Sequence, residues 1–75
     1  MQNKQNLSSA ESGQIYFVIA TDLDGIHLKR LESMGIIPGA ELDVISNETG
    51  TPLLVAVGDS RLMVDRAVAE QVIVA

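Results

Sequence analysis

Residues 26–44 of this 75-residue chain, which read IHLKRLESMGIIPGAELDV, contain the pattern that decides its fold. In the first half of this stretch, apolar side chains recur at the three-residue spacing of one helix face. The side chains on this face belong to Leu28, Leu31 and Met34. The spacing predicts a short helix over residues 26–34, with Lys29 and Arg30 turned toward solvent.

Two glycine-containing turns follow this helix. Gly35 fits the left-handed backbone position that commonly ends a helix, and Ile36 would then pack back onto the helix. If Ile36 faces inward, its neighbour Ile37 should point outward. Pro38 and Gly39 suit a type II turn, because proline fixes φ at the first central position and glycine accepts a positive φ at the second. The sequence therefore predicts a helix that ends sharply and turns directly into a strand.

Short apolar or alternating segments on both sides of the helix favour β-strands. These segments cover residues 15–20, 40–46, 53–57, 60–65 and 72–74. Gly58 and Asp59 join two of them as a two-residue hairpin, with glycine where a type II′ turn needs it. The first segment is apolar on both faces, so we expect it in the middle of the sheet. About five short strands in so small a chain predict a mainly β fold, a small barrel with one short helix.

Length and composition predict one domain that exposes some apolar surface. We place this domain at residues 7–75, after a flexible polar tail over residues 1–6. Hydrophobic residues make up 47% of the chain, which is more than so small a domain can easily bury. Because exposed apolar patches often mark contacts with a partner, we expect a protein partner, and a homo-oligomer remains open.

The composition disfavours several classes of function. The net charge is −5 and the only aromatic residues are Tyr16 and Phe17, whereas nucleic-acid binding needs a basic face and often aromatic platforms. Without cysteine, the chain can form no disulfide, thiolate zinc site or cysteine nucleophile. The longest apolar runs are far shorter than the roughly 18 residues that suggest a membrane helix. Since the polar N-terminus also lacks a signal-peptide core, we expect a cytoplasmic protein that does not insert into the membrane.

Asp22, Asp24 and His27 are weak candidates for metal ligands, because carboxylates and an imidazole close in sequence can hold a divalent ion. An EF-hand loop would need further ligands and a terminal glutamate, and an aspartate at a helix start is usually a cap. With one histidine and no cysteine, we expect no tight metal site. The sequence also lacks a phosphate-binding glycine loop and a nucleophile elbow, so we expect neither a cofactor nor an enzyme.

Residues 28–42 and 52–74 together resemble the FeoA family. In the first stretch, a helix ends in Met-Gly-Ile and is followed by Pro-Gly and a strand. In the second, a Pro-Leu start leads to a Val-Gly hairpin, an Arg-x-x-Ala turn and an apolar last strand. The resemblance spans residues 7–75, and the order and spacing of the motifs are more specific than any one of them.

This resemblance implies an SH3-like barrel and a role as a small cytoplasmic accessory protein of bacterial ferrous iron uptake. Members of the family are thought to act on FeoB, a membrane iron transporter with a cytosolic GTP-binding domain. The same fold also occurs as the C-terminal domain of iron-dependent repressors. A divalent-metal-responsive regulatory domain of that kind is therefore the alternative function.

The surface that we expect to bind the partner is centred on Lys29, Arg30 and Ile37. Lys29 and Arg30 form the only adjacent basic pair in an acidic chain, and arginine is common at interface hot spots. Ile37 should add exposed apolar area beside them. These residues therefore predict a docking surface on the helix and on the turn that follows it.

Overall fold

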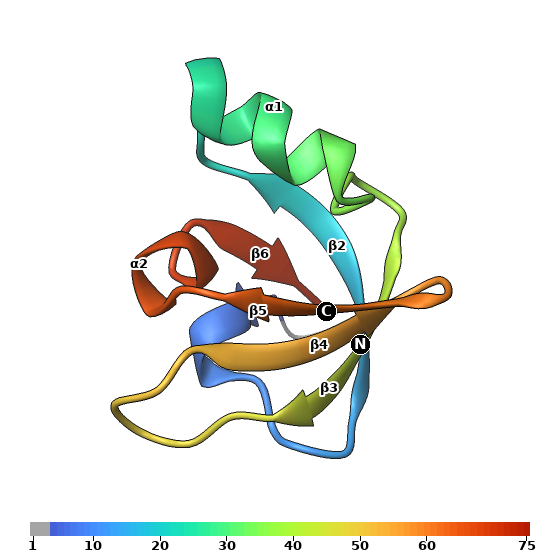
Figure 1. Cartoon of the computed structure of the whole chain (residues 1–75), viewed down its shortest axis with the longest axis vertical. Helices are drawn as coiled ribbons and strands as arrows, with labels where there is room; N and C mark the ends of the chain where they lie inside the picture. Colours follow the sequence, from blue (N-terminus) through green and yellow to red (C-terminus); the bar gives the residue numbers. More distant parts are fainter. Residues whose placement is uncertain (1–3) are drawn as a thin grey trace.

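Six antiparallel strands form the sheet of this protein and curl around one apolar core (Figure 1). The computed structural model describes residues 4–75. In chain order the elements are β1 (Gln5–Asn6), the 3-10 helix η1 (Leu7–Ser9), β2 (Ile15–Thr21), α1 (Gly25–Ser33), β3 (Glu41–Ser46), β4 (Leu53–Val57), β5 (Ser60–Val64), α2 (Arg66–Ala69) and β6 (Val72–Val74). The strands lie in the order β1-β6-β2-β3-β4-β5, so the predicted central position of β2 is confirmed.

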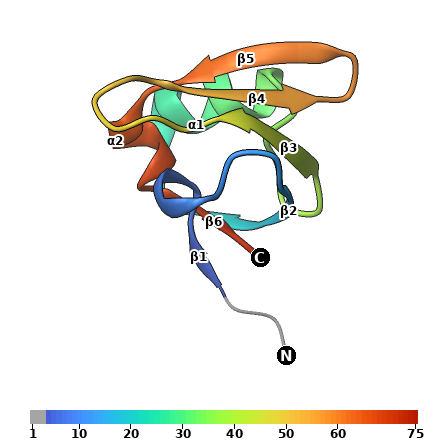
Figure 2. The same ribbon diagram turned by 90° about the horizontal axis from the view of Figure 1, so that it is seen from below.

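The mainly β fold is confirmed, with one strand more than the sequence predicted. The additional strand is β1, in which Gln5 lies opposite Val74 and Asn6 opposite Ile73 of β6 (Figure 2). We had expected these two polar residues in a flexible tail. They form a strand because the backbone of β6 pairs with theirs. Nothing in the two polar side chains themselves predicts this pairing. Residues 1–3 of the predicted tail lie outside the described part of the chain.

The core consists of side chains that point inward from alternate strand positions. In β3, Leu42 and Val44 are buried whereas Glu41 and Asp43 are exposed, as the two-residue period of a strand predicts. The core contains Leu7, Ala10, Val18, Leu31, Ile36, Leu42, Val44, Leu53, Val55, Val64, Ala69, Val72 and Val74. It is thus built from aliphatic side chains, and its many valines have few rotamers to lose on folding.

The end of α1 has the geometry that the sequence predicts. Gly35 has a φ of +85°, and its N–H donates to the C=O of Glu32 at 3.1 Å. The N–H of Ile36 donates to the C=O of Leu31 at 3.0 Å. These two hydrogen bonds define a Schellman motif, which places Ile36 back against the helix. Both Ile36 and Leu31 are buried, so the helix end is fixed to the core.

The predicted type II turn forms directly after this motif. Gly39 has a φ of +91°, and the N–H of Ala40 donates to the C=O of Ile37 at 2.9 Å. Gly39 also donates to the C=O of Val18 at 2.8 Å, which attaches the turn to β2. Ile37 is 45% exposed, and its predicted outward orientation is therefore confirmed.

The hairpin between β4 and β5 also follows the prediction. Val57 lies opposite Ser60, so two residues connect the strands. Gly58 has a φ of +57°, while no described residue other than glycine has a positive φ. A positive φ at the first central position alone is the pattern of a type II′ turn.

β2 is apolar on both faces, as its sequence shows, but the structure buries only part of it. Ile15 and Phe17 are 56% and 47% exposed, whereas Val18 is buried. β2 pairs with β3 on one edge and with β6 on the other, which satisfies its backbone. Pairing at both edges makes a strand central, but it does not cover both faces, and the outer face of β2 remains in contact with solvent.

A polar cluster that the sequence did not predict connects α2, the β3–β4 loop and η1. The guanidinium of Arg66 donates to Oδ1 of Asn47 at 2.6 Å and also to the C=O of Glu48. The side-chain amide of Asn47 donates to the C=O of Ser8 at 3.1 Å and of Ala10 at 2.6 Å. We call Arg66, Asn47 and these carbonyl groups the Arg66 cluster. It holds three segments that are distant in sequence against one another.

Candidate functional site

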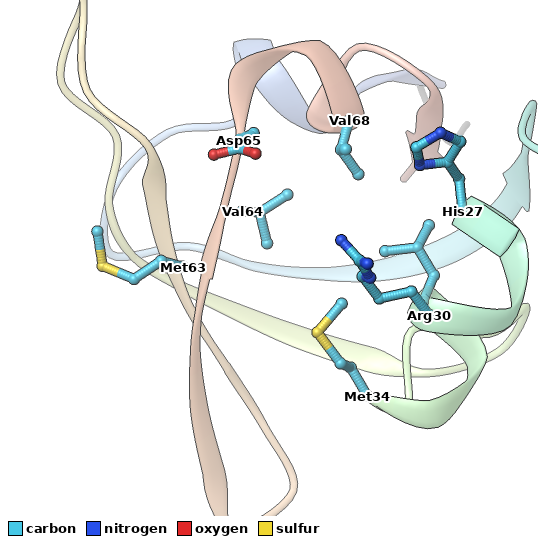
Figure 3. A pocket seen from close by; sticks show the side chains of 8 residues that line it. His27, Arg30, Met34, Met63, Val64, Asp65 and Val68 are labelled. Atoms are coloured by element: carbon cyan, nitrogen blue, oxygen red, sulfur yellow. The ribbon is translucent and has the colours of Figure 1, made fainter.

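A groove of about 250 Å³ lies between α1 on one side and β5 and α2 on the other (Figure 3). Residues of α1 and its C-cap form one wall, and the end of β5 and the start of α2 form the other. The lining residues are His27, Arg30, Leu31, Met34, Met63, Val64, Asp65 and Val68. The groove is small for a drug-sized ligand, but it is large enough for one apolar side chain of a partner.

The floor of this groove is apolar and its rim is polar. Leu31 and Val64 are buried at the bottom, and the half-buried Met34 and Val68 continue the apolar surface. Met63 is 64% exposed, and its side chain points away from the groove on the other side of β5 (Figure 3). Methionine side chains adapt to the shape of what they contact, which suits a binding surface. The arrangement is that of a site that takes up apolar groups.

The polar rim carries charges of both signs. On the α1 wall, Arg30 and His27 are exposed and point toward the groove (Figure 3). On the opposite wall lies the exposed Asp65. Within residues 4–75, no ion pair engages the guanidinium of Arg30, so its charge is available to a ligand. The α1 wall is therefore locally basic on a chain whose net charge is −5.

The structure brings only one of the three predicted partner-binding residues into this groove. Lys29, Arg30 and Ile37 are all exposed, but only Arg30 lines the groove. Lys29 lies beside it on α1, and Ile37 lies in the turn after the helix. The predicted surface and the groove are thus neighbours that share Arg30.

Sequence reasoning missed the second wall of the groove. Met63, Asp65 and Val68 meet α1 only because β5 runs past the helix, which is a long-range arrangement. An available signal was the outward position of Met63, since the strand pattern places Leu62 and Val64 on the other face. A large apolar side chain on the solvent face of a strand indicates a possible contact surface.

Among the described residues, the three candidate metal ligands do not form a metal-binding group, either with one another or with further side chains. Asp22, Asp24 and His27 are exposed. Asp24 is the N-cap residue of α1 by its backbone, but its side chain makes no capping hydrogen bond, so the cap that we expected from Asp22 or Asp24 is wrong. In the part of the chain that the structure covers, no three His, Cys, Asp or Glu side chains gather as a metal-binding group.

The helices of residues 4–75 are all too short or too polar to cross a lipid bilayer. The mainly β barrel with its one short helix has the architecture of a small SH3-like domain. The FeoA domain model matches residues 5–75, and the chain therefore belongs to the FeoA family. Among curated proteins, none matches the chain.

Solved structures of FeoA proteins share nearly the whole fold. An iron uptake regulatory protein (FeoA) is 26% identical with a TM-score of 0.88, over 97% of this chain and 96% of that chain. The zinc-complexed FeoA of Stenotrophomonas maltophilia, a prokaryotic SH3-domain protein, is 28% identical with a TM-score of 0.82. That alignment covers 95% of this chain and 89% of the other. The SH3-like fold that the family resemblance implied is confirmed.

Metal-dependent repressors contain the same fold within longer chains. A manganese-dependent transcriptional repressor is 20% identical with a TM-score of 0.86, over 96% of this chain and 41% of the repressor. The repressor IdeR of T. acidophilum is 19% identical with a TM-score of 0.81, over all of this chain and 35% of that chain. At such low identities, these relatives establish the shared fold only.

Proposed function

We propose that this protein is a cytosolic accessory protein of bacterial ferrous iron uptake that docks onto the cytosolic part of a FeoB-type membrane transporter. The observation that carries this proposal is the FeoA family match over residues 5–75. The Stenotrophomonas maltophilia relative is described as a candidate activating factor of ferrous iron transport, which agrees with such a role. The protein acts by binding and catalyses no reaction itself.

The docking surface in this proposal is the exposed side of α1 with the turn after it. Lys29 and Arg30 give it positive charge, and Ile37 gives it apolar area. Charge at the rim of an interface mainly raises the association rate, whereas a buried apolar contact slows dissociation. The two kinds of residue should therefore affect binding in different ways.

The test is binding of purified variants to the detergent-solubilised transporter. Arg30→Glu should weaken binding in a salt-dependent way, and Ile37→Asp should weaken it by about tenfold or more with little salt dependence. Lys4→Glu is the matched control, because Lys4 is an exposed cation that lies outside α1 and the turn. All three variants should melt like the wild-type protein, since none changes the core. Wild-type affinity of the folded Arg30→Glu and Ile37→Asp variants would exclude this surface.

A divalent-metal-responsive regulatory domain is the second candidate function. Two observations favour it: metal-dependent repressors share the fold, and a FeoA relative was solved with zinc. Anaerobic calorimetry with Fe(II) or Mn(II) distinguishes the two functions. Saturable sub-micromolar binding that is lost in His27→Ala would favour the metal-responsive function. Transporter binding that is unaffected by these ions would favour the accessory function.

A further inference from the structure

β5 is an end strand of the sheet, and one of its edges has no partner strand. The strand order places β5 last, next to β4 only. Figure 2 shows β5 and β1 on opposite sides of the molecule, so β1 does not close the barrel over this edge. An unpaired edge presents free N–H and C=O groups that another extended chain can pair with.

The hairpin geometry identifies which backbone groups of β5 face outward. In a two-residue hairpin, the residues that flank the turn form a hydrogen-bonded pair, and such pairs then alternate with pairs that make no hydrogen bond. Val57 and Ser60 flank the turn, so the non-bonded pairs are Ala56 with Arg61 and Leu54 with Met63. The N–H and C=O groups of Arg61 and Met63 therefore point away from β4, toward the free edge.

No other described segment takes up these backbone groups. The hydrogen bonds of turns, loops and caps within residues 4–75 include none from the backbone of Arg61 or Met63. Both residues are also exposed. The free edge is thus accessible at two positions that are separated by one residue, which is the spacing at which an added strand forms its hydrogen bonds.

The groove borders the α2 end of this same edge. Met63 and Val64 both line it, although successive side chains of a strand point to opposite faces. Met63 is 64% exposed and Val64 is 3% exposed, so the two do lie on opposite faces. Met63 lines the groove although its side chain points away from it (Figure 3), so the groove meets the backbone at the edge of β5. Figure 3 shows this arrangement, with α1 across the groove from β5.

The charges around the edge favour an acidic ligand. The chain has five Lys and Arg residues. Three of them lie on α1 and β5, namely Lys29, Arg30 and Arg61, whereas these two elements carry one acidic residue, Glu32. Asp65 lies at the α2 end of the groove, so the acidic groups of a ligand should lie toward Arg30 and Arg61. A second copy of this chain fits less well, because it would bring the same three cations to the contact.

We propose that the free edge of β5 and the groove beside it bind an extended partner segment as an added strand. The segment carries an apolar side chain, which enters the groove above Leu31 and Val64. It also carries carboxylates, which pair with Arg30 and Arg61. Main-chain hydrogen bonds from Arg61 and Met63 supply the affinity that does not depend on sequence, and the groove and the charges supply specificity. The proposed function enters this inference at one point only: it assigns the partner segment to the cytosolic part of the transporter.

The direct test is NMR titration of the full chain with synthetic peptides. The first probe is an acetylated, amidated hexapeptide of alternating leucine and glutamate. We expect the amide signals of Arg61 and Met63 to shift and their hydrogen exchange to slow. A leucine–lysine peptide should bind at least about fivefold more weakly, because the carboxylates are lost. A leucine–glutamate peptide with methyl groups on the amide nitrogens that face β5 should not bind, because these nitrogens can no longer donate hydrogen bonds to the strand.

Two variants of one residue separate the backbone from the side chain. Met63→Pro removes the outward N–H without removing a bond to β4, and edge positions of this kind tolerate proline. Met63→Ala keeps the N–H and removes the side chain. Peptide binding should be lost in Met63→Pro and should weaken by only a few-fold in Met63→Ala. If Met63→Pro does not fold, which its melting curve will show, the N-methylated peptide decides the question.

Several results would overturn the inference. These are equal binding of the N-methylated and parent peptides, equal binding of the lysine and glutamate peptides, signal changes only outside β5 and α1, or no binding at millimolar peptide. Concentration-dependent self-association that shifts the same β5 amides would show a second copy as the occupant. Transporter binding that is unchanged in Met63→Pro would leave the proposed function standing and reject this site. Peptide binding at β5 without any transporter binding would reject the proposed function and keep the site.

Discussion

Replacing Gly35 by alanine should destabilise the protein, and the cause can be divided into two parts. Gly35 has a φ of +85°, and residues with a Cβ lose about 1–2 kcal/mol in the left-handed region. A Cβ at this position would lie 3.3 Å from Cγ1 of Val57, which is a tight contact. Since valine is stiff at χ1, moving it off its rotamer costs about 0.5–1.5 kcal/mol more. The alanine also restricts the unfolded chain, which offsets about 0.4–1 kcal/mol.

Gly50→Ala is the matched control for this prediction. Gly50 has a φ of +84°, but an added Cβ there meets no atom within 4 Å. Gly50→Ala should therefore cost about 0.5–1 kcal/mol, and Gly35→Ala about 1–2.5 kcal/mol. Urea unfolding of both variants measures the difference, and adding Val57→Ala to Gly35→Ala should reduce it. If the two single variants lose equal stability, the contact with Val57 has no effect. If neither loses stability, the helix does not depend on the left-handed residue.

Three further predictions concern stability and metal binding. Leu31→Ala should cost about 2–5 kcal/mol, as truncation of a buried leucine does, and a wild-type melting curve would contradict its place in the core. Asn47→Ala should cost about 1–3 kcal/mol in urea unfolding, because it leaves polar groups of the Arg66 cluster without partners. Asn47→Asp should lose less stability than Asn47→Ala. The aspartate keeps the oxygen that accepts from Arg66, but it removes the amide that donates to the C=O groups of Ser8 and Ala10. Titration of metal-free protein should give no sub-micromolar binding of Mn(II), and tight binding that requires His27 would contradict this.

The parts of the fold that the sequence predicts are those with local causes. The Schellman motif at Gly35 and the two-residue hairpin at Gly58 each depend on a few adjacent residues, and both form as predicted. The alternation of β3 is likewise a local pattern. In each case, one backbone conformation suits the residues at hand, so the tertiary structure agrees with the local preference.

The parts that the sequence does not predict depend on contacts between distant segments. β1 is a strand only because β6 pairs with it, and Arg66 finds its partners in the β3–β4 loop and η1. The same holds for the candidate site: Arg30 could be selected from the sequence as an exposed cation, whereas Met63 and Asp65 could not be placed across from it. Nothing in the spacing of these residues indicates that β5 runs alongside α1.

Contacts next to the groove fix both of its walls to the rest of the protein, and this lowers the entropic cost of binding a ligand. On the α1 wall, the Schellman motif fixes the helix end, and the buried Leu31 holds the helix to the core. On the other wall, Val64 is buried, and Arg66 ties the start of α2 to the β3–β4 loop. A groove whose walls are fixed in the free protein loses little conformational entropy when a ligand binds. The exposed Arg30 can then adapt to the ligand while the framework stays in place, so substitution of Arg30 should change affinity without changing the unfolding curve.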